Sequence, residues 1–186
     1  MADALTLSLT FIGMLSVFCW VLACIFRDAS IADLFWPLYH ALAATTYLYV
    51  ASAEEVSTLA VVFSLLICLW ASRLFLHLFF RRLGQEEDHR YAAIRERNRE
   101  HFWWQSFFTI FLMQSCLAWL ICAPFSHVIL SPQSFSVLHG LGLFFMAIGL
   151  MYEWVADQQL KNYLHKNSTD DDEKPGVLAQ GLWKFS

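Results

Sequence analysis

The sequence predicts an all-α membrane protein, a polytopic helical bundle with five membrane spans. Of its 186 residues, 58% are hydrophobic and 15% are charged, whereas about 25% of the residues in soluble domains are charged. The apolar residues form five long runs, and the charged residues lie between them. Only helices satisfy all their own backbone groups in lipid, so each run is expected to be a helix. This composition excludes a disordered chain, a nucleic-acid-binding protein and an ordinary soluble enzyme.

Each run is long enough to cross the hydrocarbon layer, which takes about 20 apolar residues. The chain begins M-A-D-A-L, without a positively charged segment, so the first run is predicted to be a span and not a cleaved signal peptide. The five cysteines lie inside the apolar runs in no metal-ligand pattern and indicate neither a disulfide framework nor a metal site. The spans are expected at about Leu5–Phe26, Ile31–Ala51, Ser57–Phe80, Phe102–Ala123 and Phe135–Ala156.

The basic residues predict the orientation. Arg27 follows the first span, six arginines lie between 81 and 99, and four lysines lie between 161 and 184. Five spans place these three segments on one side, while the loops at 52–56 and 124–134 contain no Lys or Arg. The positive-inside rule therefore predicts that the N-terminus is outside and that the loop at 81–101 and the C-terminal segment are cytoplasmic. An integral membrane protein is expected.

The second and third spans carry polar residues toward their cytoplasmic ends. Asp33 opens the second span, where an N-capping or first-turn role is an alternative to function. His40 lies about two turns deeper, where an interhelical hydrogen bond is expected before a catalytic role. In the third span, Arg73 and His77 share one face, so Arg73 either reaches for lipid headgroups or contributes to a cationic stripe at the cytoplasmic mouth.

The fourth and fifth spans add an amide and two carboxylates. Gln114 is in the middle of the fourth span, where an interhelical hydrogen bond is expected. Glu153 and Asp157 are spaced i, i+4 at the cytoplasmic end of the fifth span, so they share one face and disfavour each other's ionisation. They are either hydrated residues beyond the membrane or partners of arginines or of ligand hydroxyl groups.

The loop at 81–101 mixes six arginines with five acidic residues. The acidic residues argue against a simple lipid-binding basic patch, since mutual pairing cancels much of the field. Two interpretations remain: a salt-bridged interfacial helix, or a lid that contacts phosphate through arginine side chains. The polar residues thus gather in the cytoplasmic third, in front of an aromatic core that a flat, lipid-soluble molecule could enter.

Several short motifs resemble those of the steroid 5-alpha-reductase-like membrane proteins, in particular a short, uncharacterised bacterial branch. They occur in family order over nearly the whole chain. The matching pieces are S-I-A-D-L-F-W-P at 30–37, G-Q-E-E-D-H-R-Y-x-x-x-R at 84–95, F-W-W-Q-S-F-F at 102–108 with Gln114 after it, Y-E-W-V-A-D-Q-Q-L at 152–160, and G-L-W-K-F-S at 181–186.

The resemblance implies a reductase of about seven helices that uses NADPH to reduce the conjugated C=C bond of a lipophilic enone, steroid-like or isoprenoid-like. It implies cofactor binding by Arg73, Glu153 and Asp157, with Glu87, Asp88, Arg90 and Tyr91 beside the nucleotide. The steroid enzymes place a tyrosine and a glutamate around the substrate carbonyl. Here Trp70 falls near that tyrosine, the second span has no glutamate, and Asp33 and His40 are the candidates for the missing role.

In the family, the G-L-W motif continues into R-H-P-N-Y-F-G-E and two further helices. The chain is therefore expected to be C-terminally truncated relative to the family, with residues 1–156 as the five-helix domain and 157–186 as a cytoplasmic segment leading into the rest of it. On this basis we expect the 186-residue chain to be inactive and to bind NADPH weakly or not at all. Two alternatives stay open: an S-adenosylmethionine-dependent methyltransferase of the isoprenylcysteine carboxyl methyltransferase type, and a non-catalytic membrane protein.

Overall fold

The computed structural model describes residues 1–53, 56–85, 87–131, 135–167 and 178–185. The chain divides into two compact units, residues 1–135 and 136–186. This division follows packing, whereas the boundary expected at 156/157 separated membrane from cytoplasm. All regular elements among the described residues are helical, as predicted.

The first unit contains three long helices in sequence: α1 (Ala2–Phe26), α2 (Ile31–Ala51) and α3 (Thr58–Arg82). The second helix has the bounds predicted for the second span. A left-handed Arg27, with φ 57°, ends α1, and the side chain of Ser57 caps α3 by accepting a hydrogen bond from the backbone of Ala60. Short turns therefore connect neighbouring helices and favour an up-and-down arrangement.

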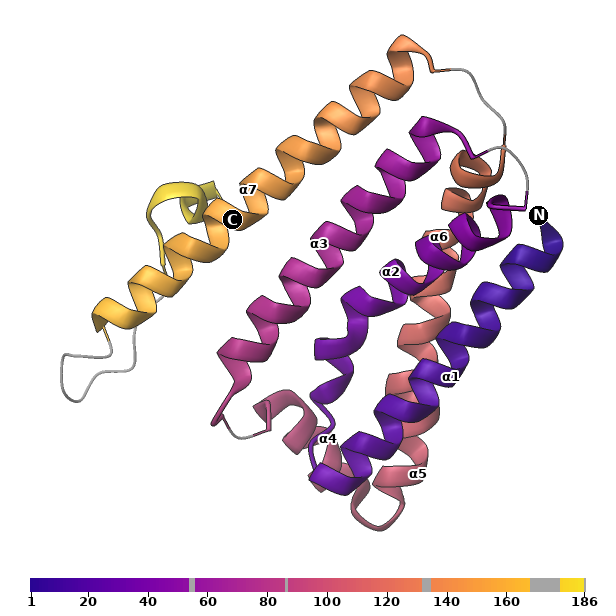
Figure 1. The fold of residues 1–186 in the computed structure, drawn as a ribbon. Coiled ribbons are helices and arrows are strands. Elements are labelled where there is room, and N and C mark those ends of the chain that lie inside the picture. The colour runs from indigo at the N-terminus through magenta and orange to yellow at the C-terminus, as the bar shows by residue number, and fades with distance from the viewer. Residues whose placement is uncertain (54–55, 86, 132–134, 168–177, 186) are drawn as a thin grey trace. The chain divides into compact units, whose positions relative to one another are not determined.

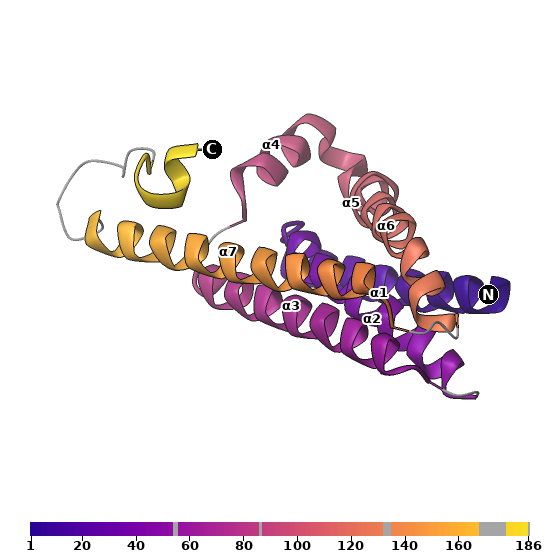
Figure 2. The same ribbon diagram turned by 90° about the horizontal axis from the view of Figure 1, so that it is seen from above.

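The second half of the unit begins with α4 (His89–Asn98) and a 3₁₀ turn, η1 (Arg99–His101). One continuous helical segment follows, made of α5 (Phe102–Ser106), a π-helical stretch η2 (Phe107–Leu112) and α6 (Met113–Leu130). Figure 2 shows these three pieces running on as one helix. Helix α4 lies at the end of the bundle away from the N-terminus (Figure 1), and we call this end the α4 end.

Helix α2 is the centre of the first unit and packs against α1, α3 and α6. Its Tyr39 and Tyr47 are completely buried. The face of α1 that packs inward is built from small residues at helical spacing, which lets two helices approach closely in a membrane. The buried residues of α1 are Ala4, Ser8, Ile12, Ser16, Cys19 and Ala23.

The outward faces of the bundle are strongly apolar. Leu65 and Leu69 on α3 are both more than 60% exposed, and Leu120 on α6 is 58% exposed. Four helical segments are long and apolar enough to cross a membrane: α1, α3, His89–Leu130 and Val137–Leu164. Helix α2, with 21 residues, has the length of a span but is not one of these four segments.

The second unit consists of α7 (Val137–Asn167) and a short 3₁₀ helix, η3 (Gly181–Phe185). The side-chain carbonyl of Gln159 accepts a hydrogen bond from the backbone of Leu182, and the indole of Trp183 donates to the carbonyl of Ala156. Gly181 has φ +62°, and a Cβ there would lie 2.4 Å from Gln159 Oε1. Glycine therefore suits position 181, because any other side chain there would be strained and would displace the Gln159 amide that binds Leu182.

Candidate functional site

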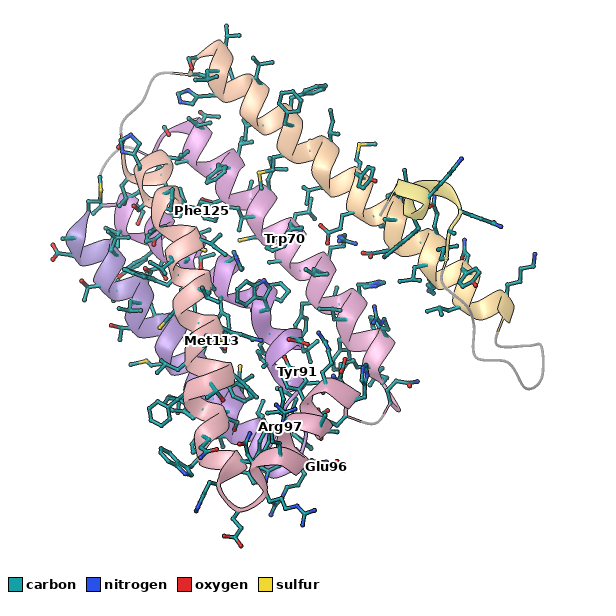
Figure 3. All side chains as sticks on the ribbon, turned by 180° about the vertical axis from the view of Figure 1, so that it is seen from behind. Trp70, Tyr91, Glu96, Arg97, Met113 and Phe125 are labelled. Atoms are coloured by element: carbon teal, nitrogen blue, oxygen red, sulfur yellow. The ribbon has the colours of Figure 1, made fainter. Side chains whose placement is uncertain are left out.

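Three polar side chains from three elements meet at the α4 end. The hydroxyl of Tyr91 on α4 donates to Asp33 Oδ1, in the first turn of α2, over 2.7 Å. The side-chain amide of Gln114, on α6, donates to the same oxygen over 3.3 Å and lies 3.5 Å from the Tyr91 hydroxyl. Tyr91 is 8% exposed, and Figure 3 shows it on α4, beside the ends of α2 and α6. We call these three residues the Asp33 cluster.

Arg90 connects this cluster to the start of α4. Its guanidinium binds Asp88 through two nitrogens, at 3.0 and 3.1 Å, and reaches Asp33 Oδ2 at 3.3 Å. Asp88 caps α4 by accepting a hydrogen bond from the backbone of Arg90 over 2.9 Å. The guanidinium bond and then this backbone bond lower the pKa of Asp88 from its usual 3.8 to about 2. Asp88 therefore stays ionised well into the acid range.

Glu87 fastens the loop before α4 to the turn between α1 and α2. Its Oε1 accepts a hydrogen bond from the backbone of Ala29 over 2.9 Å, and its Oε2 lies 2.8 Å from Arg95 Nη1. The side chain of Glu87 is 8% exposed. Arg95 also donates to the backbone carbonyl of Arg27 over 3.0 Å. Both carboxylate oxygens of Glu87 are thus used in holding the protein together.

The turn itself continues the network to α3. Asp28 Oδ1 accepts hydrogen bonds from the backbone and the hydroxyl of Ser30, and Asp28 Oδ2 lies 2.6 Å from Arg82 Nη2. The hydroxyl oxygen of Ser30 in turn accepts from the backbone of Asp88 over 2.9 Å. The α1–α2 turn, the end of α3 and the start of α4 are therefore joined by charged hydrogen bonds, which are the stronger kind.

A π-helical stretch immediately precedes Gln114. A π-helical turn holds more residues than an α-helical turn, so η2 rotates the side chains that follow it relative to an unbroken α-helix. Such stretches are frequent at functional sites. Gln114 follows this stretch by two residues, and its amide contacts Asp33 and Tyr91. In α2, Pro37 has no backbone N–H and cannot donate the helical hydrogen bond to the carbonyl of Asp33. The regular helical hydrogen bonding is therefore interrupted next to the cluster in α2 as well.

His40 lies apart from the cluster, in the aromatic core. Its ring stands edge-on to those of Trp36 and Trp70, with both centroid distances at 5.3 Å. It is 5% exposed, and its Nδ1 lies 3.1 Å from the carbonyl of Trp36. The hydrogen bond of His40 therefore stays within α2 and is not the interhelical bond expected for this position, while its ring contact with Trp70 packs α2 against α3. Of the two residues named for the missing carbonyl role, only Asp33 joins the cluster.

The remaining predicted cofactor residues fall in different units. Arg73 is on α3, half-buried and one turn beyond Trp70. Glu153 and Asp157 are one turn apart on α7, in the second unit. Their assignment to a cofactor stays a prediction.

The family resemblance implied that Glu87, Asp88, Arg90 and Tyr91 lie beside a nucleotide. In the structure these side chains contact other residues of the protein, which agrees with the alternative interpretation of the loop as a salt-bridged helix. The partners in the turn, Asp28 and Ser30, were not predicted, whereas the interhelical hydrogen bond expected of Gln114 is confirmed by its contact with Asp33. The repeated acid in R-D-A-S-I-A-D (27–33) was the available signal, because two carboxylates so close to a membrane surface need cationic partners.

The cluster is suited to hydrogen-bond donation and not to metal binding. No group of three or more His, Cys, Asp or Glu side chains that could hold a metal ion occurs in the part of the chain that the structure describes. The hydroxyl of Tyr91 can rotate about its C–O bond, so it can turn from Asp33 to another acceptor. Asp33 would then keep its bonds from Gln114 and Arg90.

Comparison with known proteins gives one family. The match is to "Protein of unknown function (DUF1295)" and covers residues 19–186, which is most of the chain. We found no significant match to a curated protein or to a solved structure. A helical membrane bundle with a hydrogen-bonded polar cluster at one end thus belongs to the DUF1295 family of proteins of unknown function.

Proposed function

We propose that the protein is a membrane reductase of the steroid 5-alpha-reductase-like type, which uses NADPH to reduce the conjugated C=C bond of a lipophilic enone. The observation that carries this proposal is the Asp33 cluster, with its tyrosine hydroxyl held 2.7 Å from a carboxylate. Such a reaction needs a donor that polarises the carbonyl oxygen, and a positioned tyrosine can serve. The family-like motifs, in their order along the chain, support the same assignment.

In this proposal Tyr91 turns its O–H to the carbonyl oxygen of the substrate. The amide of Gln114, 3.5 Å from the Tyr91 oxygen, supports that oxygen as negative charge develops. The bond from Tyr91 to Asp33 is then broken, and Tyr91 is held by the burial of its ring and by the Arg90 guanidinium 5.8 Å from the ring centroid. NADPH, when bound, supplies the hydride.

The candidate cofactor-binding side chains differ in how well they suit a nucleotide phosphate. Arg73 offers a guanidinium, which suits phosphate. Glu87 and Asp88 are carboxylates already engaged by Arg95 and Arg90, so they do not fit a direct contact with phosphate. In this proposal the two acids shape the α4 end. Arg73, in the first unit, and Asp157, in the second, stay candidates for cofactor binding.

Ligand protection tests the class of function. The protein expressed from its complete gene, in lipid nanodiscs, is heated with NADPH or with S-adenosylmethionine. We expect protection by NADPH alone, and at least about tenfold weaker NADPH binding in Asp157→Ala. Protection by S-adenosylmethionine alone would contradict the proposed reductase activity and favour the methyltransferase alternative.

Kinetics test the role of Tyr91. With NADPH and a steroid enone, we expect Tyr91→Phe to lower kcat about 100-fold, the usual size of a lost proton donor, and to leave the KM for NADPH unchanged. Tyr49→Phe is the matched control, since Tyr49 is 73% exposed at the far end of α2. Equal kcat values in the two variants would remove Tyr91 from the mechanism.

A further inference from the structure

The charges of the α4 segment are sorted between its two sides. The acids that face the bundle are paired: Glu87 with Arg95 at 2.8 Å, and Asp88 with Arg90 at 3.0 Å. These pairs use two of the arginines between 81 and 99, and Arg82 is taken by Asp28. Glu87, Asp88 and Asp28 are thus engaged by Arg95, Arg90 and Arg82, and no ion pair among the described residues joins them to Arg97 or Arg99.

The outer side keeps its basic residues. Arg97 and Arg99 are exposed, and neither makes an ion pair with any residue that the structure describes. Arg81, at the end of α3, is exposed as well. The exposed acids of α4 and η1 are Glu96 and Glu100. Figure 3 shows Arg97 and Glu96 at the α4 end, next to Tyr91.

Exposed aromatic side chains mark the depth of this surface in a membrane. Trp104 on α5 is 58% exposed, and Phe108 on η2 is 51% exposed. The guanidinium of Arg27 lies 5.5 Å from the ring centroid of Trp103. Aromatic rings beside arginines are typical of the boundary between hydrocarbon and headgroups. The outer arginines are therefore placed where a bilayer presents its phosphates.

We propose that the outer face of α4 and η1, through Arg97 and Arg99, binds the headgroups of anionic phospholipids. A guanidinium offers paired donors that match a phosphate, and an anionic membrane surface attracts basic residues next to a span. Unlike a soluble phosphate, a lipid headgroup is present at this depth wherever the protein is inserted. The proposal is independent of the reductase activity.

Lipid retention tests the proposal on the full chain. The protein is released from nanodiscs of phosphatidylglycerol and phosphatidylcholine with identical acyl chains, and retained lipids are counted by native mass spectrometry. We expect preferential retention of phosphatidylglycerol, with a preference at least about fivefold lower in Arg97→Gln/Arg99→Gln. The matched variant Glu96→Gln/Glu100→Gln removes two exposed charges of the opposite sign and should keep or increase the preference.

Two controls separate lipid binding from a loss of folding and from binding of a soluble anion. Both double variants change exposed residues, so their unfolding temperatures in pure phosphatidylcholine should equal that of the parent. An unchanged preference in Arg97→Gln/Arg99→Gln would overturn the proposal, as would a lost preference in the glutamate variant. It would also be overturned if inorganic phosphate at physiological concentration displaced the phosphatidylglycerol, because the site would then serve a soluble anion.

Discussion

The two ends of the first unit are held together by different chemistry. At the N-terminal end, Ser8 donates to the hydroxyl of Tyr47 over 3.1 Å, and the indole of Trp119 donates to Ser8 over 3.2 Å. These three groups come from α1, α2 and α6, and all are neutral. At the α4 end, a comparable junction uses four carboxylates and three arginines: Asp28, Asp33, Glu87, Asp88, Arg82, Arg90 and Arg95.

The difference separates helix packing from surface chemistry. Neutral hydrogen bonds are enough to join three helices in a bilayer, as the N-terminal end shows. Charged groups are costly at membrane depth and need partners or water. Among the described residues, the charged network lies at the α4 end, and this is the end where an ionic or polar ligand could be received. Substitutions at both ends test this comparison.

The largest effect is expected from Glu87→Ala. It removes the acceptor of the Ala29 backbone N–H and the carboxylate that pairs with Arg95, which is left, among the described residues, with the carbonyl of Arg27 alone. We expect a loss of about 2–3 kcal/mol in the free energy of unfolding, measured by detergent titration with circular dichroism. Glu96→Ala, an exposed change on the same helix, should cost less than about 0.5 kcal/mol. Equal losses would mean that the inner contacts contribute nothing.

A smaller effect is expected at Asp88. Asp88→Asn keeps a capping oxygen but loses the charge that binds Arg90. The pKa of Asp88 is lowered in the folded protein, so the charge contributes stability above its usual pKa of 3.8, and this is lost as the pH falls toward 2. Unfolding temperatures between pH 5 and about pH 2 should therefore fall less steeply in Asp88→Asn. Parallel curves would contradict the cause given for the pKa.

The helices were predictable because span length and charge placement are local properties. The bounds of α2 agree with those expected for the second span, and the G-L-W motif was recognised although its fold onto Gln159 was not. The π-helical stretch before Gln114 was not predictable, since nothing in F-F-T-I-F-L distinguishes it from an α-helix.

Which side chains of the site pair with one another could not be predicted from the sequence either. The loop's arginines and acids alternate, and only the fold decides which of them turn inward. Asp33 was a candidate from its position, but its partner Tyr91 is 58 residues away in the chain. Such a contact depends on how α4 returns to the start of α2.

The smallest effect is expected from two buried tyrosines on α2, which form a matched pair. Tyr47 accepts a hydrogen bond from Ser8, whereas the hydroxyl of Tyr39 lies near Ser16 and Cys19 but makes no well-formed hydrogen bond among the described residues. Tyr47→Phe should cost about 0.6 kcal/mol of unfolding free energy, the average for hydrogen bonds between membrane helices. Tyr39→Phe removes a poorly satisfied hydroxyl and should cost nothing or stabilise the protein. Both are measured in the same detergent titration. If Tyr39→Phe proved the more costly, the Tyr39 hydroxyl would have an effective partner, such as Ser16 or a bound water. The neutral interior of the bundle would then hold polar groups by hydrogen bonds that contribute to stability, as the α4 end does.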